Sequence, residues 1–148
     1  MNIKKQPFTI LMAEDNEHDI VATKRAFKKH NINNPLHIVN DGEECLDYLY
    51  KRGKYAQPET APRPSLLLLD IRMPKMDGLT VLKHIREDDS FRLLPVVILT
   101  VSKAEEDKLK SYKLGANAYI KKPVEFDNFA EAIKRVNLFW EVVELPEE

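Results

Sequence analysis

Acidic, hydroxyl and basic side chains follow the short apolar runs of this sequence, each at the point where a run ends. They are Glu14 and Asp15 after FTILMA, Asp70 at the end of SLLLLD, Thr100 at the end of VVILT, and Lys122 after AYIK. If each run is a strand of one parallel sheet, the carboxyl ends of the strands meet at one edge, where open α/β sheets bind ligands. Three acids, a hydroxyl and an ammonium are therefore predicted to converge on one site.

Three carboxylates at one edge predict a bound cation. At roughly 5 Å and an effective dielectric constant of about 20, each pair of carboxylates repels by about 3 kcal/mol. A hard divalent cation removes that repulsion, and an all-oxygen site suits Mg²⁺ or Mn²⁺ better than zinc. We expect Mg²⁺, which keeps several water ligands of its own.

The remaining groups suit phosphoryl transfer. The Thr100 hydroxyl can donate to one phosphoryl oxygen, and the Lys122 ammonium can neutralise another. A carboxylate beside a metal and a lysine can form an aspartyl phosphate, and Asp70 is the carboxylate that ends a strand. Taken singly, these residues have plainer explanations, such as helix capping by Asp15 or solvation of Lys122. Their conjunction at four strand ends, in the expected order, favours the site.

The apolar periodicity predicts the elements that position these groups. Continuous apolar runs predict strands buried on both faces, and apolar residues at spacings of three and four predict amphipathic helices. The predicted strands are residues 8–13, 36–40, 65–70, 96–100 and 118–121. Five helices are predicted. The first opens at residues 14–16 and ends near residue 30, the second runs from 43 to about 51, and the third carries Leu79, Leu82 and Ile85. The fourth runs from 103 to about 114 behind a Ser102–Glu105 capping box, and the fifth spans 126–136.

Five strands, each followed by a helix, predict an α/β fold. Right-handed crossovers and the number of elements favour a flavodoxin-like (βα)5 doubly wound parallel sheet with strand order 2-1-3-4-5. The chain, residues 1–148, is predicted to be a single domain with a core of about residues 8–137 and a C-terminal extension, 138–148. Residues 53–64 contain three prolines and are expected to be loop.

Composition excludes several other classes of protein. Lys and Arg total 23 against 24 for Asp and Glu, which leaves no basic face for nucleic acid. The longest apolar stretches, residues 10–13 and 66–69, are too short to cross a bilayer, and no secretory signal is present, so we expect a cytoplasmic protein with no membrane partner. Cys45 is expected to be buried in a helix, and the four scattered histidines to be surface residues rather than metal ligands.

Four motifs carry a family resemblance: ILMAEDN, SLLLLDIRMPKMDGL, VVILTVS and LGANAYIKKP. Together they make the sequence, from about residue 8 to 136, resemble the CheY-like receiver domains of response regulators in two-component systems. The resemblance implies that Asp70 accepts the phosphoryl group. The ligands that it implies for Mg²⁺ are Glu14, Asp15, Asp70 and the backbone carbonyl of Arg72.

Further roles come with the same resemblance. Thr100 and Lys122 are the hydroxyl and the ammonium that contact the phosphoryl group, since Lys122 directly precedes a proline and Lys121 does not. The Lys122–Pro123 peptide bond is cis in such proteins. Tyr119 falls at the position of an aromatic switch, whose ring moves as the threonine engages the phosphoryl group. A half-buried aromatic at a strand edge, without that role, is nearly as good an account of Tyr119.

Departures from the family pattern concern the rate of dephosphorylation rather than the chemistry. Glu14 replaces the more usual aspartate and still supplies oxygen ligands. Arg72, two residues after the acceptor, offers no carboxylate to activate a hydrolytic water. Val101 is bulkier than the small residue often found there, and Ser102 occupies another position that tunes the phosphoryl lifetime.

Two segments point to a particular branch of the family. The loop GKYAQPETAPRP and the tail NLFWEVVELPEE are similar to single-domain regulators that partner bacteriophytochrome-type histidine kinases. A sensor histidine kinase is therefore the expected partner, with a homodimer through the face of the fourth helix, fifth strand and fifth helix. The tail carries five apolar residues that pack either on their own domain or on a partner: Phe139, Trp140, Val142, Val143 and Leu145.

The predicted function is that of a receiver, which takes a phosphoryl group on Asp70 and signals by changing shape. Such a protein acts on no separate substrate and is not an enzyme in the usual sense. A haloacid-dehalogenase-like phosphatase needs an acid where Arg72 stands, and a dinucleotide-binding protein needs a glycine-rich turn at residues 13–16. About 12 residues after Val136 are too few for a DNA-binding domain, so output through protein contacts is expected. A phosphorylation-independent interaction module on the same fold remains the open alternative.

Overall fold

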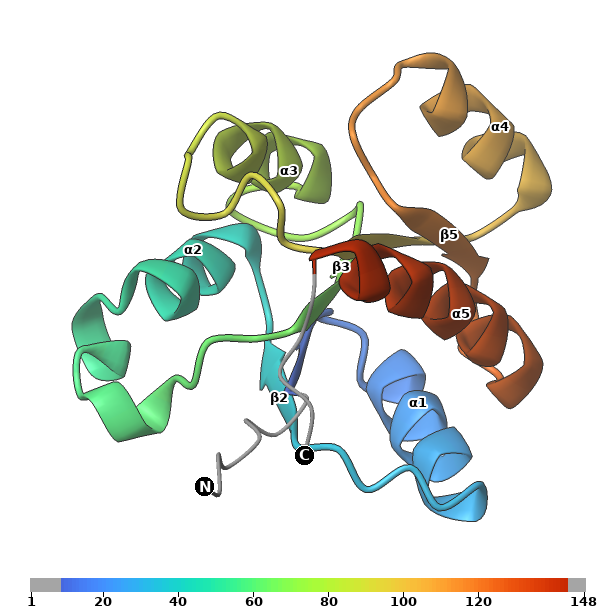
Figure 1. The fold of residues 1–148 in the computed structure, drawn as a ribbon, viewed down its shortest axis with the longest axis horizontal. Helices are drawn as coiled ribbons and strands as arrows, with labels where there is room; N and C mark the ends of the chain where they lie inside the picture. The colour runs from blue at the N-terminus through green and yellow to red at the C-terminus, as the bar shows by residue number, and fades with distance from the viewer. Residues whose placement is uncertain (1–8, 144–148) are drawn as a thin grey trace.

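The computed structural model, which describes residues 9–143, contains one sheet of five parallel strands. The strands are β1 (Ile10–Ala13), β2 (Leu36–Val39), β3 (Leu66–Asp70), β4 (Val96–Thr100) and β5 (Ala118–Lys121). Their order across the sheet is β2-β1-β3-β4-β5, which confirms the predicted flavodoxin-like topology. Figure 1 shows the helices arranged around this sheet.

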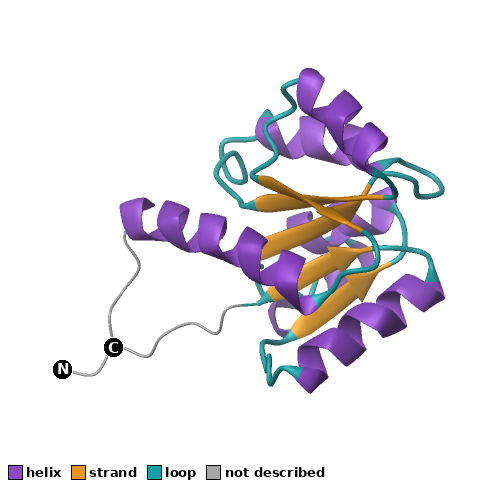
Figure 2. Cartoon of the chain, turned by 90° about the vertical axis from the view of Figure 1, so that its right-hand side faces the viewer, coloured by secondary structure: helices purple, strands orange, loops and turns teal. Residues whose placement is uncertain are grey.

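Five helices cover the two faces of the sheet. They are α1 (Glu17–Lys29), α2 (Gly42–Tyr50), α3 (Gly78–Arg86), α4 (Lys103–Ser111) and α5 (Phe126–Val143). Helices α2, α3 and α4 pack on one face, and α1 and α5 pack on the other, so the sheet forms the middle layer (Figure 2). Among residues 9–143, no helix has both the length and the apolar character to span a bilayer.

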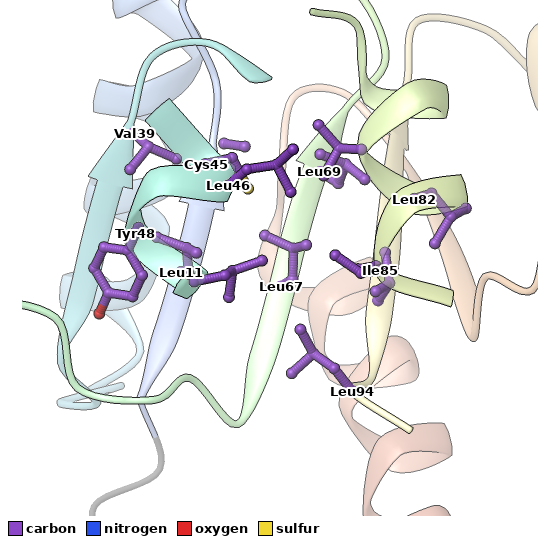
Figure 3. Close-up of a cluster of buried hydrophobic side chains, with 14 of the residues drawn as sticks. Leu11, Val39, Cys45, Leu46, Tyr48, Leu67, Leu69, Leu82, Ile85 and Leu94 are labelled. Carbon is purple, nitrogen blue, oxygen red and sulfur yellow. The ribbon is translucent and has the colours of Figure 1, made fainter. Parts of the chain in front are cut away.

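The core follows from the alternation of side chains along each strand. Successive residues of a strand point to opposite faces of the sheet. In β3, Leu67 and Leu69 therefore join the cluster under α2 and α3 (Figure 3). Leu66 and Leu68 join the cluster under α1 and α5. Cys45 on α2 is fully buried, as predicted, and burial raises the pKa of its thiol to about 12.

Side-chain caps begin four of the helices at the carboxyl edge of the sheet. In each, an oxygen of the capping residue accepts the N–H of the third helical residue. The caps are Asn16 for α1, Asp41 for α2, Asp77 for α3 and Ser102 for α4, with distances of 3.0, 2.7, 2.9 and 3.0 Å. These bonds fix the loops that leave β1, β2, β3 and β4, and those loops carry the polar side chains of the edge.

Two connections differ from the prediction. Helix α4 ends at Ser111 rather than near residue 114, because the backbone of Lys113 is left-handed, with φ of 53°, and breaks the helix before Gly115. The segment between α2 and β3, expected to be loop, contains two single-turn 3-10 helices: Gly53–Tyr55 and Pro58–Thr60.

Helix α5 also extends further than predicted. The expected extension began at residue 138, but the helix continues to Val143. No glycine or proline occurs between residues 124 and 145 to stop it. The structure describes the backbone but not the side chains after Arg135, and Leu145 lies outside the described residues. The packing expected of five apolar side chains therefore stays a prediction: Phe139, Trp140, Val142, Val143 and Leu145.

Gly78 lies against the strand end that carries Asp70, and alanine at this position is expected to destabilise the fold. A Cβ at Gly78 would lie 2.2 Å from the carbonyl oxygen of Asp70, so the backbone must shift. We expect Gly78→Ala to lower the free energy of unfolding by about 3 kcal/mol, measured by urea unfolding. In the control Gly53→Ala the Cβ meets nothing within 4 Å. The free energy of unfolding should then fall by only about 1 kcal/mol, which is the cost of a left-handed φ of 58° for alanine. Equal losses in the two variants would contradict the steric explanation.

Candidate functional site

Four of the polar side chains that the sequence placed at the carboxyl edge line one cleft of about 500 Å³. Glu14 directly follows β1, Asp15 is the next residue, and Asp70 is the last residue of β3. Lys122, which directly follows β5, lines the same cleft. Glu14 and Asp70 are buried, whereas Asp15 is exposed. The structure thus brings together four of the residues that the sequence placed at the site.

Lys122 contacts three carboxylates at once. Its Nζ lies 3.1 Å from Glu14 Oε1, 3.2 Å from Asp70 Oδ1 and 3.0 Å from Asp19 Oδ2. The side chain of Lys122 is only 11% exposed, so these pairs are formed largely away from water. The backbone N–H of Ile71 also donates to Asp70 Oδ1, at 2.9 Å. The Lys122–Pro123 peptide bond is cis, in agreement with the resemblance.

Glu14, Asp15 and Asp70 can hold a divalent cation. One carboxylate oxygen from each lies within 4.8 Å of the other two. A cation with oxygen ligands at about 2.1 Å needs neighbouring ligands within about 4 Å of each other, so small side-chain rotations bring these three into one shell. Carboxylate oxygens are the donors that Mg²⁺ and Mn²⁺ prefer, so the donor set fits the predicted class of metal.

One ammonium does not neutralise this many acids. Burial and the charge of Asp70 raise the pKa of Glu14 to about 7, and the hydrogen bond from Asn16 and the pairing with Lys122 only partly oppose them. Burial likewise raises the pKa of Asp70 above its usual value, despite the ammonium of Lys122. Burial alone would lower the pKa of Lys122, but the hydrogen bond to Asp19 and the charges of Asp70 and Glu14 raise it. The cleft therefore carries an excess of negative charge that favours a cation.

Thr100 and Tyr119 do not line the cleft. Thr100 is fully buried at the end of β4, and its hydroxyl donates to the carbonyl oxygen of Ile120 in β5, at 3.4 Å. Tyr119 is half-buried in β5, with the Nζ of Lys110 lying 5.6 Å from the centre of its ring. A role for either residue at the acidic site requires the side chain to move from this position.

An ion pair crosses the mouth of the cleft. Arg72, in the loop after β3, contacts Glu105 of α4 through Nη2 and Oε2, at 3.0 Å. The other oxygen of Glu105 accepts the N–H of Val101, at 2.9 Å. The predicted cap at Ser102 is confirmed, but Glu105 bonds to Val101 and not to the N–H of Ser102 that a capping box uses. The role of the Arg72 carbonyl as a metal ligand stays a prediction.

The sequence analysis did not identify Asp19 or Glu105 as members of the site. Asp19 lies four residues after Asp15, in the first turn of α1, and its carboxylate contacts Lys122. The sequence contained a signal for Asp19, because a helix that opens at residues 14–16 keeps its first turn, and with it Asp19, near the carboxyl edge of the sheet. Glu105 was assigned to capping alone, although a carboxylate has two oxygens and its second one contacts Arg72.

Comparison with known proteins agrees with this arrangement. A model of the response regulator receiver domain family matches residues 10–134. That match covers every strand and all of the acidic site. The chain belongs to the response regulator receiver domain family. This receiver domain is also 36% identical over 141 residues to the response regulator Rcp1 of Synechocystis sp., with 95% of this chain and 94% of Rcp1 covered.

Solved structures of bacteriophytochrome response regulators share the fold. AtBRR is 41% identical, with a TM-score of 0.83, and 97% of this receiver domain and 99% of AtBRR are covered. RtBRR is 39% identical, with a TM-score of 0.84, and coverage is 97% of this receiver domain and 84% of RtBRR. A Mn(2+)-bound form of Rcp1 has a TM-score of 0.70 at 35% identity, over 95% of this receiver domain and 100% of Rcp1. Receiver domains linked by name to phytochromes are thus among its relatives.

Proposed function

We propose that this receiver domain takes a phosphoryl group from a phosphohistidine of a sensor kinase onto Asp70, with Mg²⁺, and passes the signal to protein partners by changing shape. The observation that carries the proposal is the place of Asp70. Its carboxylate lies among the three that can share a cation and 3.2 Å from the ammonium of Lys122. A nucleophile in such surroundings is suited to attack a phosphorus atom.

The transfer follows from these positions. An oxygen of Asp70 attacks the phosphorus in line with the bond to the histidine nitrogen, the new O–P bond forms as the N–P bond breaks, and the electron pair returns to the imidazole. Glu14, Asp15 and Asp70 would hold Mg²⁺, which when bound would supply positive charge to offset that of the transferring group. Lys122 donates a hydrogen bond to one of these oxygens from its place beside Asp70. Water later releases the phosphoryl group, so the protein acts only on itself and on no separate substrate.

Thr100 and α4 are the proposed route of the signal. The Thr100 hydroxyl exchanges its acceptor on Ile120 for a phosphoryl oxygen, and Tyr119 moves with it. Helix α4 is suited to respond, because Leu109 is its one buried residue among those that the structure describes. The kinase is proposed to be of the phytochrome type, a proposal supported by the names of AtBRR and RtBRR.

Phosphoryl uptake from a small donor tests the proposal. Incubation with acetyl phosphate and Mg²⁺ is expected to add the mass of one phosphoryl group to the intact protein. Excess EDTA is expected to prevent the gain, because the acidic cleft then holds no cation to offset the charge of the donor. No gain with either Mg²⁺ or Mn²⁺ would favour the phosphorylation-independent interaction module instead.

A further inference from the structure

Asp19 makes the shortest of the three ion pairs with Lys122. Its Oδ2 lies 3.0 Å from Nζ, against 3.1 Å for Glu14 and 3.2 Å for Asp70. An ammonium has three N–H donors and no more. Two of the three contacts are hydrogen bonds, to Glu14 and Asp19, and Asp70 is held as an ion pair. Asp19 therefore accepts one of the three N–H groups of Lys122.

Asp19 differs from the other two partners in what happens to it during the reaction. Glu14 belongs to the group that can hold a cation, and Asp70 is the proposed acceptor, so both change their charge environment when the metal and the phosphoryl group arrive. Asp19 belongs to neither group. Its contact with Lys122 is the one that can persist through the transfer.

The position of Asp19 is fixed by the start of α1. Its backbone N–H donates to the capping oxygen of Asn16 at 3.0 Å, and its carbonyl oxygen accepts the Thr23 hydroxyl at 2.9 Å. Lys122, by contrast, carries its charge on a flexible four-carbon stem that loses much rotational freedom when held in place. A carboxylate anchored on a capped helix reduces that loss.

We propose that Asp19 is a positioning residue that holds the ammonium of Lys122 beside Asp70 for phosphoryl transfer. The proposal rests on the function proposed above. With Glu14 turned towards a cation, Asp19 keeps Nζ between α1 and β3, and two N–H donors are left for the phosphoryl oxygens. Without Asp19, the ammonium reaches the same place less often.

The experiment measures the rate of phosphoryl uptake from acetyl phosphate, with Mg²⁺ present, over a range of donor concentrations. Asp19→Asn is expected to lower the maximal rate about tenfold, while the half-saturating donor concentration stays nearly constant, because orientation of the ammonium matters most in the transition state. Asp19→Glu retains the carboxylate and is expected to recover most of the rate. The control Asp127→Asn removes the same charge from the first turn of α5, where the side chain is exposed.

The outcomes separate this inference from the proposed function. If the wild type takes up no phosphoryl group, both are wrong. If the wild type is active and Asp19→Asn matches Asp127→Asn, only the inference is wrong. The inference is also wrong if Asp19→Glu does not recover the uptake rate, or if the rate falls in step with the urea midpoint of unfolding. Either result shows that Asp19 merely stabilises α1. A tenfold lower maximal rate at an unchanged urea midpoint, recovered in Asp19→Glu, supports the inference.

Discussion

Asp70→Asn is expected to abolish phosphoryl uptake and, in the absence of metal, to make the fold more stable. An amide is not a nucleophile towards phosphorus, so uptake from acetyl phosphate should fall below about one thousandth of the wild-type rate. The amide oxygen can still accept the N–H of Ile71, so the strand end is kept. Intact mass after incubation with the donor measures the first effect, and urea unfolding in EDTA at pH 7.5 measures the second.

The gain in stability follows from the raised pKa of Asp70. Burial raises that pKa above its usual value, which means that the folded state opposes the charge that Asp70 carries at neutral pH. Removing the charge also relieves Glu14, whose pKa is raised by burial and then by Asp70. Lys122 keeps its contacts with Glu14 and Asp19. We therefore expect Asp70→Asn to unfold at higher urea than the wild type in EDTA at pH 7.5.

The exposed Asp127 provides the control for both effects. Asp127→Asn should take up a phosphoryl group like the wild type and unfold within about 0.5 kcal/mol of it. An Asp70→Asn protein that unfolds at lower urea than the wild type would show that its inactivity reflects damage to the fold. Uptake by Asp70→Asn would mean that another side chain is the acceptor.

The strands and the position of Asp70 could be predicted because each depends on a local signal. The run that ends at Asp70 is apolar in every position before the acid, and only a strand covered on both faces buries all of it. Asp70 then lies at the carboxyl edge by the geometry of parallel strands. The same reasoning placed Glu14 and Lys122 at this edge, and in the structure Lys122 contacts both Glu14 and Asp70.

The remaining features depend on contacts between distant parts of the chain. The Thr100 hydroxyl donates to the carbonyl oxygen of Ile120 because β5 pairs with β4. The residues next to Thr100 in the sequence do not indicate that Ile120 lies beside it. Glu105 reaches Arg72 across 33 positions of sequence. The end of α5 was placed too early, at the last apolar residue of the helical spacing, Val136, although residues 137–145 contain no glycine or proline to stop the helix.

Crowded acids that oppose folding are a reason to expect function at this cleft. Glu14 is fully buried, and a nonfunctional surface would not keep that carboxylate beside Asp70 with one ammonium shared among three acids. A bound cation would offset the negative charge that these acids share. The same excess of charge predicts how stability depends on pH.

In the absence of metal, the free energy of unfolding is expected to fall as the pH rises from 5.5 to 7.5. Burial and then Asp70 raise the pKa of Glu14 from 4.5 in the reference state to about 7 in the folded protein. Between these values the unfolded chain has lost its proton and the folded protein has kept it, so each step up in pH favours unfolding. The loss relative to acid pH approaches about 3 kcal/mol at pH 7.5. About 2 kcal/mol of it falls between pH 5.5 and 7.5, and urea unfolding in EDTA at these two pH values measures that part.

Metal and one substitution isolate Glu14 as the cause. Mg²⁺ is expected to cancel the fall, because it stabilises the ionised carboxylates of the folded state alone. Glu14→Gln should remove most of the pH dependence in EDTA, leaving the smaller part due to Asp70, whose shift has the same sign. The exposed Glu43→Gln should retain the fall. Glu44 does not affect this comparison. Its pKa is lowered in the folded protein, so its contribution to the free energy of unfolding is nearly constant above its reference pKa of 4.5. A wild type that gains stability between pH 5.5 and 7.5 in EDTA would mean that Lys122 neutralises the cleft without a cation.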